Sequence, residues 1–377
     1  MSVRPAKTPL HDLLVERIRA RGPITFAEYM ETCLYHPEFG YYSGTTDRCR
    51  ADYYTSVDVS PVFGRLLARQ LHEMWTRLGR PEPFIIVEGG AAAGALARQI
   101  LDFARALLPE FYAVLRYWAV EVSKARRVLQ SAALAEHLAA GRAFSTEKLP
   151  ETIAEGCIFS NELLDALPVH RVVMRRGELR EIYVDAEGDR LVERALPESS
   201  AAVGDYFNVQ GVQLQEEQEA EAGLAACHWI EEAGERLGRG FVLTIDYGRE
   251  ARELYDEHHV RGTMLAYSRH RASEDFYRAP GEQDLTAHVS WTALDRWGHR
   301  SGLARTGLAS QTNFLLAIAR ANDFADLGTD DPGETGQVRA RLLFQNLIHP
   351  EGMGEMFQVM AQHKGIAVPN LTGFQRF

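Results

Sequence analysis

A glycine-rich segment that follows an apolar run is the part of this sequence best suited to chemistry. The run covers residues 84–88, and the acid and glycines that come with it are Glu88, Gly89, Gly90 and Gly94. Small residues between a strand and a helix let backbone N–H groups and the helix N-terminus approach a nucleoside-bearing cofactor. Close packing of a strand against a helix, with no ligand, is the alternative interpretation.

A second acid, Glu121, ends the next apolar run of the chain. At the end of a second strand, an acid can accept hydrogen bonds from both ribose hydroxyls of an adenosine. In dinucleotide-binding enzymes this acid lies about 20 residues after the glycines, whereas Glu121 lies further along, and the glycines do not match G-x-G-x-x-G. The spacing therefore favours an S-adenosylmethionine (SAM) methyltransferase, with Glu88 near the amino acid end of the cofactor.

Polar residues also follow the short apolar run at 157–160, and they are Asn161, Glu162 and Asp165. The carboxyl ends of parallel strands line the ligand crevice of an open sheet, so we expect these residues near the sulfonium and the methyl acceptor. Two carboxylates can hold a guanidinium by bidentate hydrogen bonds and aim one nitrogen at the methyl group. Helix capping by Asn161 and Asp165 is the alternative that the sequence leaves open.

A third polar cluster precedes the helical pattern that starts at Ser60-Pro61, and it covers residues 52–60. Simple helix capping explains hydroxyls and carboxylates at such a place. The density of tyrosines around it, at 41, 42, 53 and 54, also suits the wall of a pocket. The histidines at 170, 258 and 259 lack a third ligand at a useful spacing, so we expect no metal site.

The composition restricts the class of protein. The chain has 377 residues and a formal net charge of −11, which argues against general nucleic-acid binding. Its four cysteines are not in C-x-x-C spacing, so reduced thiols and a cytoplasmic location are expected. No apolar run reaches the roughly 20 residues that a membrane-spanning helix needs. The N-terminus lacks an apolar signal core, and a helix starting near Thr8 leaves little room for a transit peptide.

The order of elements predicts an α/β fold with additions at its N-terminus. Capping residues and apolar periodicity predict three helices before residue 79, starting at Thr8-Pro9, Thr25 and Ser60-Pro61. Strands and helices then alternate, which implies a mostly parallel sheet covered by helices. The predicted strands are 84–88, 116–122, 157–160 and 241–246, and the predicted helices are 94–108, 124–140, 218–237 and 336–348. Residues 169–174 and 179–184 are predicted to form a strand pair.

These patterns divide the chain into an N-terminal helical cap at 1–79 and a Rossmann-like domain at 80–377. Two stretches break the alternation, at about 185–215 and 249–285. Both are polar and irregular, so we expect them to be insertions or lids rather than core.

Taken together, these segments resemble the MidA-type methyltransferases, the family of the mitochondrial complex I assembly factor that methylates an arginine. The resemblance covers about residues 10–365 and rests on segments that keep their order along the chain. These segments are 22–30, 40–42, 54–56, 63–64, 161–170, 246–248, 284–289, 347–350 and 353–355. The resemblance implies a class I methyltransferase fold, SAM as cofactor and, as in characterised relatives, symmetric dimethylation of a protein arginine.

The resemblance also implies roles for single residues. Glu162 and Asp165 would orient the guanidinium, with Tyr53 or His170 as pocket wall or proton acceptor. The cofactor would lie on residues 89–94 with its ribose on Glu121, and the residues expected nearby are Thr55, Ser56 and Asn161. A respiratory-complex subunit is one candidate for the protein substrate, and a homodimer is left open.

Departures from the family pattern keep two alternatives open. Ala92 stands where relatives usually have glycine, and two other family motifs are changed near the expected pocket. One alternative is an O-methyltransferase for a small carboxylate or alcohol, whose anionic acceptor could be held by Arg261, Arg269 and Arg271. The other is a non-catalytic assembly protein that keeps the fold without SAM.

Overall fold

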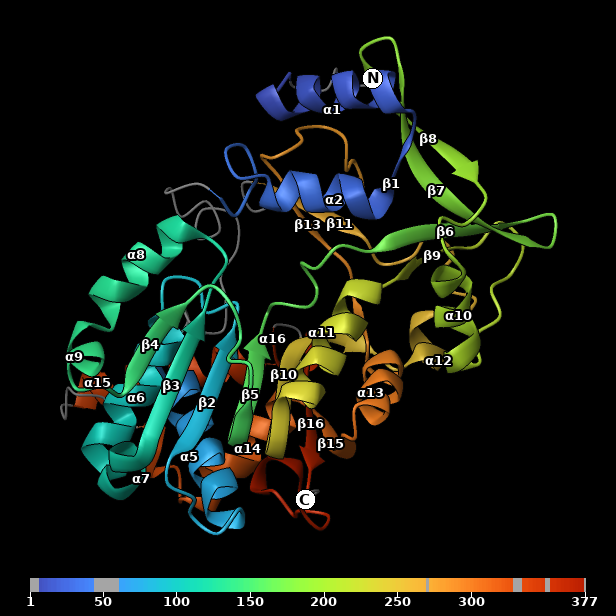
Figure 1. Ribbon diagram of the computed structural model, residues 1–377. Helices are drawn as coiled ribbons and strands as arrows, with labels where there is room; N and C mark the ends of the chain where they lie inside the picture. The colour runs from blue at the N-terminus through green and yellow to red at the C-terminus, as the bar shows by residue number, and fades with distance from the viewer. Residues whose placement is uncertain (1–6, 44–60, 269–270, 328–333, 350–352, 376–377) are drawn as a thin grey trace. The chain divides into compact units, whose positions relative to one another are not determined.

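The computed structural model describes residues 7–43, 61–268, 271–327, 334–349 and 353–375 (Figure 1). Residues 53, 55 and 56, which were predicted to belong to the site, lie outside these ranges. The chain divides into two compact units. Unit 1 comprises residues 1–53, 164–230 and 248–297, and unit 2 comprises 54–163, 231–247 and 298–377. The division that the sequence predicts at residue 79 stays a prediction.

Unit 2 is built on a sheet whose strands follow the order β15-β16-β10-β5-β2-β3-β4 (Figure 1). The run from β10 to β4 is parallel throughout, whereas β16 is antiparallel to both of its neighbours. The strands are β2 (Phe84–Gly89), β3 (Leu115–Val120), β4 (Ala143–Thr146), β5 (Ile153–Asn161), β10 (Leu237–Arg249), β15 (Ala304–Ser310) and β16 (Phe357–Lys364). This mostly parallel α/β sheet confirms the predicted fold class.

One apolar cluster joins the sheet of unit 2 to three helices. These are α5 (Pro61–Arg77), α6 (Ala95–Leu107) and α14 (Gln311–Ala321). Phe84, Phe159 and Leu243 lie in this cluster without measurable exposure. Parallel strands are buried on both faces, which explains why their sequences are continuous apolar runs.

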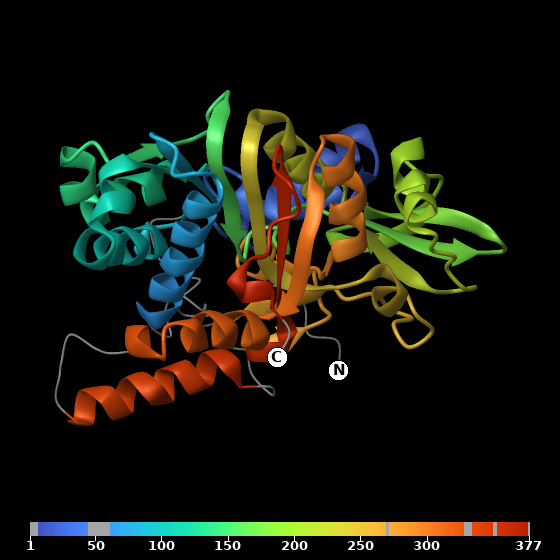
Figure 2. The ribbon, with the colours of Figure 1, turned by 90° about the horizontal axis from the view of Figure 1, so that it is seen from below.

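Several further helices complete the chain, and one of them, α15 (Glu334–Ile348), lies beside α14 (Figure 2). The helices are α7 (Pro109–Val114), α8 (Lys124–Ala133), α9 (Ala135–Ala139), α11 (Leu224–Arg236), α13 (Trp291–Arg300), α15 (Glu334–Ile348) and α16 (Met353–Met356). Short 3-10 turns occur at Ala325–Leu327 and Thr372–Phe374. Every helix in the described ranges is too short or too polar to traverse a bilayer.

Unit 1 contains two small sheets, and its N-terminal segment forms two helices. Helix α1 (Pro9–Arg21) starts at Thr8, whose hydroxyl accepts the N–H of His11, and α2 (Phe26–Tyr35) starts with the predicted capping box of Thr25 and Glu28. The first sheet joins β1 (Ile24–Thr25), β7 (Glu178–Glu187), β6 (His170–Arg175) and β9 (Glu219–Ala222), with β8 (Arg190–Leu196) on β7. The second joins β12 (Arg271–Ser273), β11 (Leu265–Ser268) and β13 (Asp284–Thr286).

Two predicted irregular segments contain regular structure. Residues 185–215 include the end of β7, all of β8 and helix α10 (Ala201–Gln210). Residues 249–285 include helix α12 (Ala251–Leu254) and the strands β11 and β12, and β14 (Val289–Ser290) follows. Their polar side chains interrupt the apolar pattern by which a strand is recognised, because these strands belong to small sheets with one face exposed to solvent.

Two predicted helices and two strands also differ from the sequence prediction. The helix predicted at 124–140 breaks near Leu134 into α8 and α9, and the one predicted at 218–237 is preceded by β9. Strands β15 and β16 were not predicted. Their residues are polar or small at many positions, and only pairing with each other and with β10 makes them strands.

Candidate functional site

The glycine-rich loop of unit 2 takes a conformation that L side chains rarely adopt. Gly90 has φ +68° and Gly94 has φ +81°, so both lie in the left-handed region that favours glycine. A Cβ atom on Gly90 would lie 2.9 Å from Cδ1 of Leu163, which follows β5. The loop therefore packs directly against the segment that carries Asn161 and Glu162.

Ala92 lies in the same region of backbone space, with φ +44°. For an L residue this conformation costs about 1 kcal/mol or more of free energy, a cost that glycine avoids. Two hydrogen bonds hold the residue in place. Its N–H donates to Oε2 of Glu121 at 3.1 Å, and its carbonyl accepts from Nε2 of Gln130 at 2.8 Å.

The carboxylate of Glu121 lies one residue beyond β3 and is only 5% exposed. Its second oxygen, Oε1, accepts the N–H of Ser123 at 2.8 Å. Both oxygens are thus oriented by backbone donors, and each carboxylate oxygen has a further lone pair. This geometry suits the recognition of two neighbouring hydroxyls.

Glu88 is the buried acid at the end of β2, 4% exposed, and its Oε2 accepts a hydrogen bond of 2.7 Å from the hydroxyl of Tyr117. Burial raises the pKa of Glu88 to about 7, with the Tyr117 hydrogen bond opposing the rise and the Glu121 charge adding to it. A cationic ammonium group placed beside Glu88 would favour its ionised form.

The segment after β5 is fixed by the neighbouring strand β10. The N–H of Glu162 donates to the carbonyl of Ile245 at 2.9 Å, and the N–H of Leu163 donates to Oδ2 of Asp246 at 3.2 Å. Glu162 has φ +52°, a strained conformation of the kind found at functional sites. Its Oε1 accepts from Nδ2 of Asn161 at 3.0 Å.

Asn161 supplies a test of whether a cofactor fits. Its Oδ1 is buried and has no hydrogen-bond partner among the described residues. Such an acceptor calls for a donor from a ligand or a water. Together with the oriented oxygens of Glu121 and the ionisable Glu88, the residues present suit a molecule that carries hydroxyls and a cationic amine.

Two predicted site residues in the described part of the chain, Asp165 and His170, belong to unit 1. The carbonyl of Asp165 accepts the N–H of Ala287 at 3.0 Å, and its side chain is largely buried. Burial raises the pKa of Tyr267, and the nearby charges of Asp165 and of Asp284, its cross-strand neighbour, raise it further. Unit 1 thus gathers two carboxylates around one phenol.

His170, at the start of β6, contacts an acid on the neighbouring strand. Its Nδ1 lies 2.7 Å from Oε1 of Glu181 on β7. Burial favours a higher pKa for Glu181, but hydrogen bonds from His170 and the Ser199 backbone outweigh it, and the net result is a lowered pKa. This contact fixes the orientation of the imidazole within the sheet.

The structure therefore gathers one group of predicted residues within unit 2, and Asp165 and His170 belong to unit 1. The residues that meet at the carboxyl ends of β2, β3 and β5 are Glu88, Gly89, Gly90, Gly94, Glu121, Asn161 and Glu162. Sequence reasoning missed Tyr117, Gln130 and Asp246 as their partners. Asp246 could have been found, because it follows an apolar run of the sequence. Nothing in the sequence distinguishes Gln130 from the other polar residues of its helix.

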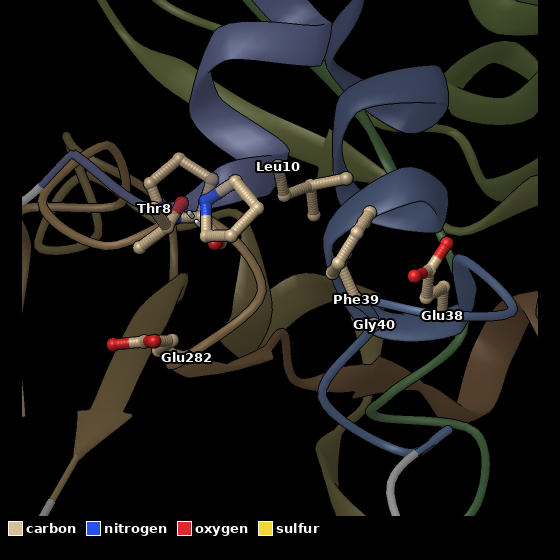
Figure 3. A pocket seen from close by; sticks show the side chains of 8 residues that line it. Thr8, Leu10, Glu38, Phe39, Gly40 and Glu282 are labelled. Atoms are coloured by element: carbon tan, nitrogen blue, oxygen red, sulfur yellow. Dashed lines mark hydrogen bonds between the residues drawn. The ribbon is translucent and has the colours of Figure 1, made fainter.

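A separate cavity of about 150 Å³ lies within unit 1 (Figure 3). It lies at the start of α1, and Glu38 and Glu282 are among the side chains that border it. None of its lining residues was predicted to belong to the site. The described residues also contain no cluster of three side chains able to hold a metal ion.

Comparison with known proteins identifies the family. Residues 66–309 match the family model of S-adenosyl-L-methionine-dependent methyltransferases. The chain belongs to this family. It is 30% identical to a protein of Burkholderia thailandensis whose crystal structure is bound to S-adenosyl-homocysteine, with a TM-score of 0.87 and coverage of 99% of this chain and 98% of that one.

The methyltransferase also has relatives among characterised proteins. It is 28% identical to the human mitochondrial protein arginine methyltransferase NDUFAF7, over 94% of this chain and 83% of the human protein. It is 26% identical to the Drosophila melanogaster homologue, over 97% of this chain and 88% of that protein. These matches confirm the MidA-type family, the class I fold, the methyltransferase activity and SAM as the cofactor.

Proposed function

We propose that this methyltransferase transfers the methyl group of SAM to an arginine side chain of a protein. The observation that carries the proposal is the strained turn at Glu162 after β5, whose next residue, Leu163, packs against Gly90 of the loop at 89–94. The names of the curated relatives, which are protein arginine methyltransferases, support the same acceptor. They do not favour the small-molecule or non-catalytic alternatives.

The proposed chemistry assigns different tasks to the chain's side chains. A guanidinium stays protonated in water, so its nitrogen must be aimed at the methyl group and must lose a proton as it is methylated. Glu162 and Asp165 would hold the guanidinium by charge-assisted hydrogen bonds. His170 or Tyr53 would serve as pocket wall or proton acceptor.

The proposed cofactor site lies on residues 89–94. SAM supplies an electrophilic methyl group when it is bound. Glu121 would accept the two ribose hydroxyls, and Glu88 would lie near the ammonium of the amino acid end. Oδ1 of Asn161 offers a further acceptor, since it is buried and without a described partner. Thr55 and Ser56 remain predicted members of this site.

Transfer of a labelled methyl group tests the proposal. The protein is incubated with SAM carrying a radioactive methyl group and with a protein extract of the cells that produce it, and labelled protein is hydrolysed. We expect the label in methylated arginine. A Glu162→Gln variant should lose about 100-fold in transfer rate and keep its affinity for S-adenosyl-homocysteine, because only the acceptor's charged partner is removed.

The matched control is Glu151→Gln, which removes an exposed carboxylate outside the proposed site. This variant should transfer methyl groups at the unaltered rate. Label confined to small molecules, or full activity of Glu162→Gln, would contradict the proposal.

Two finer statements about partners and one about location belong to the same proposal. A respiratory-complex subunit is the candidate substrate, a homodimer is open, and the expected location is the cytoplasm, whereas the curated relatives are named as mitochondrial. Identification of the labelled protein by mass spectrometry tests the first. Sedimentation and cell fractionation test the other two.

A further inference from the structure

The loop at 89–94 contains an alanine where the backbone favours a glycine. Ala92 has φ +44°, and a Cβ atom disfavours this left-handed conformation. Without support from its surroundings, the residue would relax toward the right-handed or extended regions. The conformation therefore depends on contacts that Ala92 makes with other parts of unit 2.

Two buried side chains supply these contacts at the two polar atoms of the residue. Glu121 accepts from the N–H, and Gln130 donates to the carbonyl at 2.8 Å. Glu121 belongs to the proposed ribose site, whereas Gln130 lies on α8. Gln130 has no exposed surface, so its amide cannot exchange this bond for one with bulk water.

The amide of Gln130 is itself fixed in one orientation. The hydroxyl of Ser145, on β4, donates to Oε1 of Gln130 at 2.5 Å. Since Oε1 accepts this bond, Nε2 is the end that faces the Ala92 carbonyl, as a carbonyl requires a donor. A chain of hydrogen bonds thus runs from β4 through α8 to the loop.

We infer that Gln130 is a positioning residue of the cofactor site, which sets cofactor affinity by holding Ala92 in its left-handed conformation. The inference rests on the proposed placement of SAM on residues 89–94. Loss of the Gln130 bond would let the peptide at Ala92 turn. The N–H of Ala92 would then leave Glu121, and the carboxylate would lose the orientation that suits the ribose.

The test combines two substitutions in a double-mutant cycle. Gln130→Met keeps the length of the side chain and removes the hydrogen bond, and Ala92→Gly removes the strain. Affinity for S-adenosyl-homocysteine is measured by calorimetry, with the thermal unfolding midpoint recorded for each variant. We expect Gln130→Met to weaken binding roughly tenfold, and by no more than about threefold in the Ala92→Gly background.

A second buried glutamine provides the matched control. Gln311, at the start of α14, also has no exposed surface and donates from Nε2 to a backbone carbonyl, that of Leu347 at 3.0 Å. Gln311→Met should lower the unfolding midpoint as Gln130→Met does and leave the affinity unchanged. If Gln130→Met does not fold, Ser145→Ala replaces it, because it frees the amide to rotate, and we expect a threefold loss.

Binding by Gln130→Met within twofold of the unaltered protein overturns the inference. An equal loss in both backgrounds also overturns it, since the glutamine would then act through packing and not through Ala92. The Glu121→Ala variant distinguishes a failure of this inference from a failure of the proposed cofactor site. If Glu121→Ala binds normally, the cofactor placement is wrong, whereas weak binding by Glu121→Ala with normal binding by Gln130→Met rejects the role of Gln130 alone.

Discussion

The hydroxyl of Tyr117 donates a hydrogen bond of 2.7 Å to Oε2 of Glu88 across two adjacent parallel strands. Both side chains are buried. The pair therefore places a buried ionisable group near the carboxyl ends of the strands, where the cofactor is proposed to bind. Burial raises the pKa of Glu88 to about 7, and the phenol limits the rise. Stability therefore depends on pH through this carboxyl.

Glu88 should make the folded protein less stable as the pH rises toward neutrality. An unfolded glutamate has a pKa of about 4.3, so between this value and about 7 the folded chain holds one proton more than the unfolded chain. The free energy of unfolding then falls by about 4 kcal/mol across this window and does not change further above it.

Urea unfolding of the unaltered protein and of Glu88→Gln at pH 5 and pH 8 checks this. Relative to the unaltered protein, Glu88→Gln should gain stability between the two pH values. Parallel pH trends for the two proteins would show that the carboxyl does not titrate in this window.

Glu121→Ala should weaken SAM binding by about 100-fold, because two charge-assisted hydrogen bonds to the ribose are lost. The backbone N–H groups of Ala92 and Ser123 lose their acceptors at the same time. Calorimetric titration with SAM measures the effect, with the exposed Glu151→Ala as control. Unchanged affinity would remove Glu121 from the cofactor site.

Arg171 should contribute strongly to the stability of unit 1. Its guanidinium is 5.0 Å from the ring centres of both Phe26 and Phe276 and forms ion pairs with Glu193 and Glu219. Arg171→Met leaves two acids without their cation, so we expect a loss of about 3 kcal/mol or more in urea unfolding.

The control for Arg171 is an exposed ion pair on the same strand. Arg175 lies 3.6 Å from Glu217, and both side chains are more than half exposed. Arg175→Met should cost less than about 0.5 kcal/mol. Similar losses for the two variants would mean that the burial of Arg171 has no energetic consequence.

Gly156→Ala should disrupt the centre of the large sheet. A Cβ atom there would lie 1.9 Å from the backbone oxygen of Ile85 on β2, so the strands would have to separate. We expect insoluble protein or a large loss of stability, whereas Gly223→Ala, whose nearest atoms would be 3.8 and 3.9 Å away, should fold normally. Soluble expression and circular dichroism distinguish the two.

Local signals in the sequence were sufficient for much of the fold. The caps at Thr8 and Thr25 and the apolar run of β2 are found where they were predicted, because caps and strand burial depend on residues close in sequence. The spacing from the glycines to Glu121 also predicted SAM, and in the structure helices α6 and α7 lie between the two strand ends along the chain. Strands β15 and β16 were not predicted, because their pairing joins residues about 50 positions apart in the sequence.

The sequence by itself determined the class I sheet, the cofactor and the acids at the strand ends, since parallel strands place successive carboxyl ends at one edge. Only the tertiary structure decided how those acids are held. Ala92 keeps a left-handed backbone that favours glycine because Glu121 and Gln130 bind its two polar atoms. Such partners depend on where a helix and a strand meet in space, which no local pattern encodes.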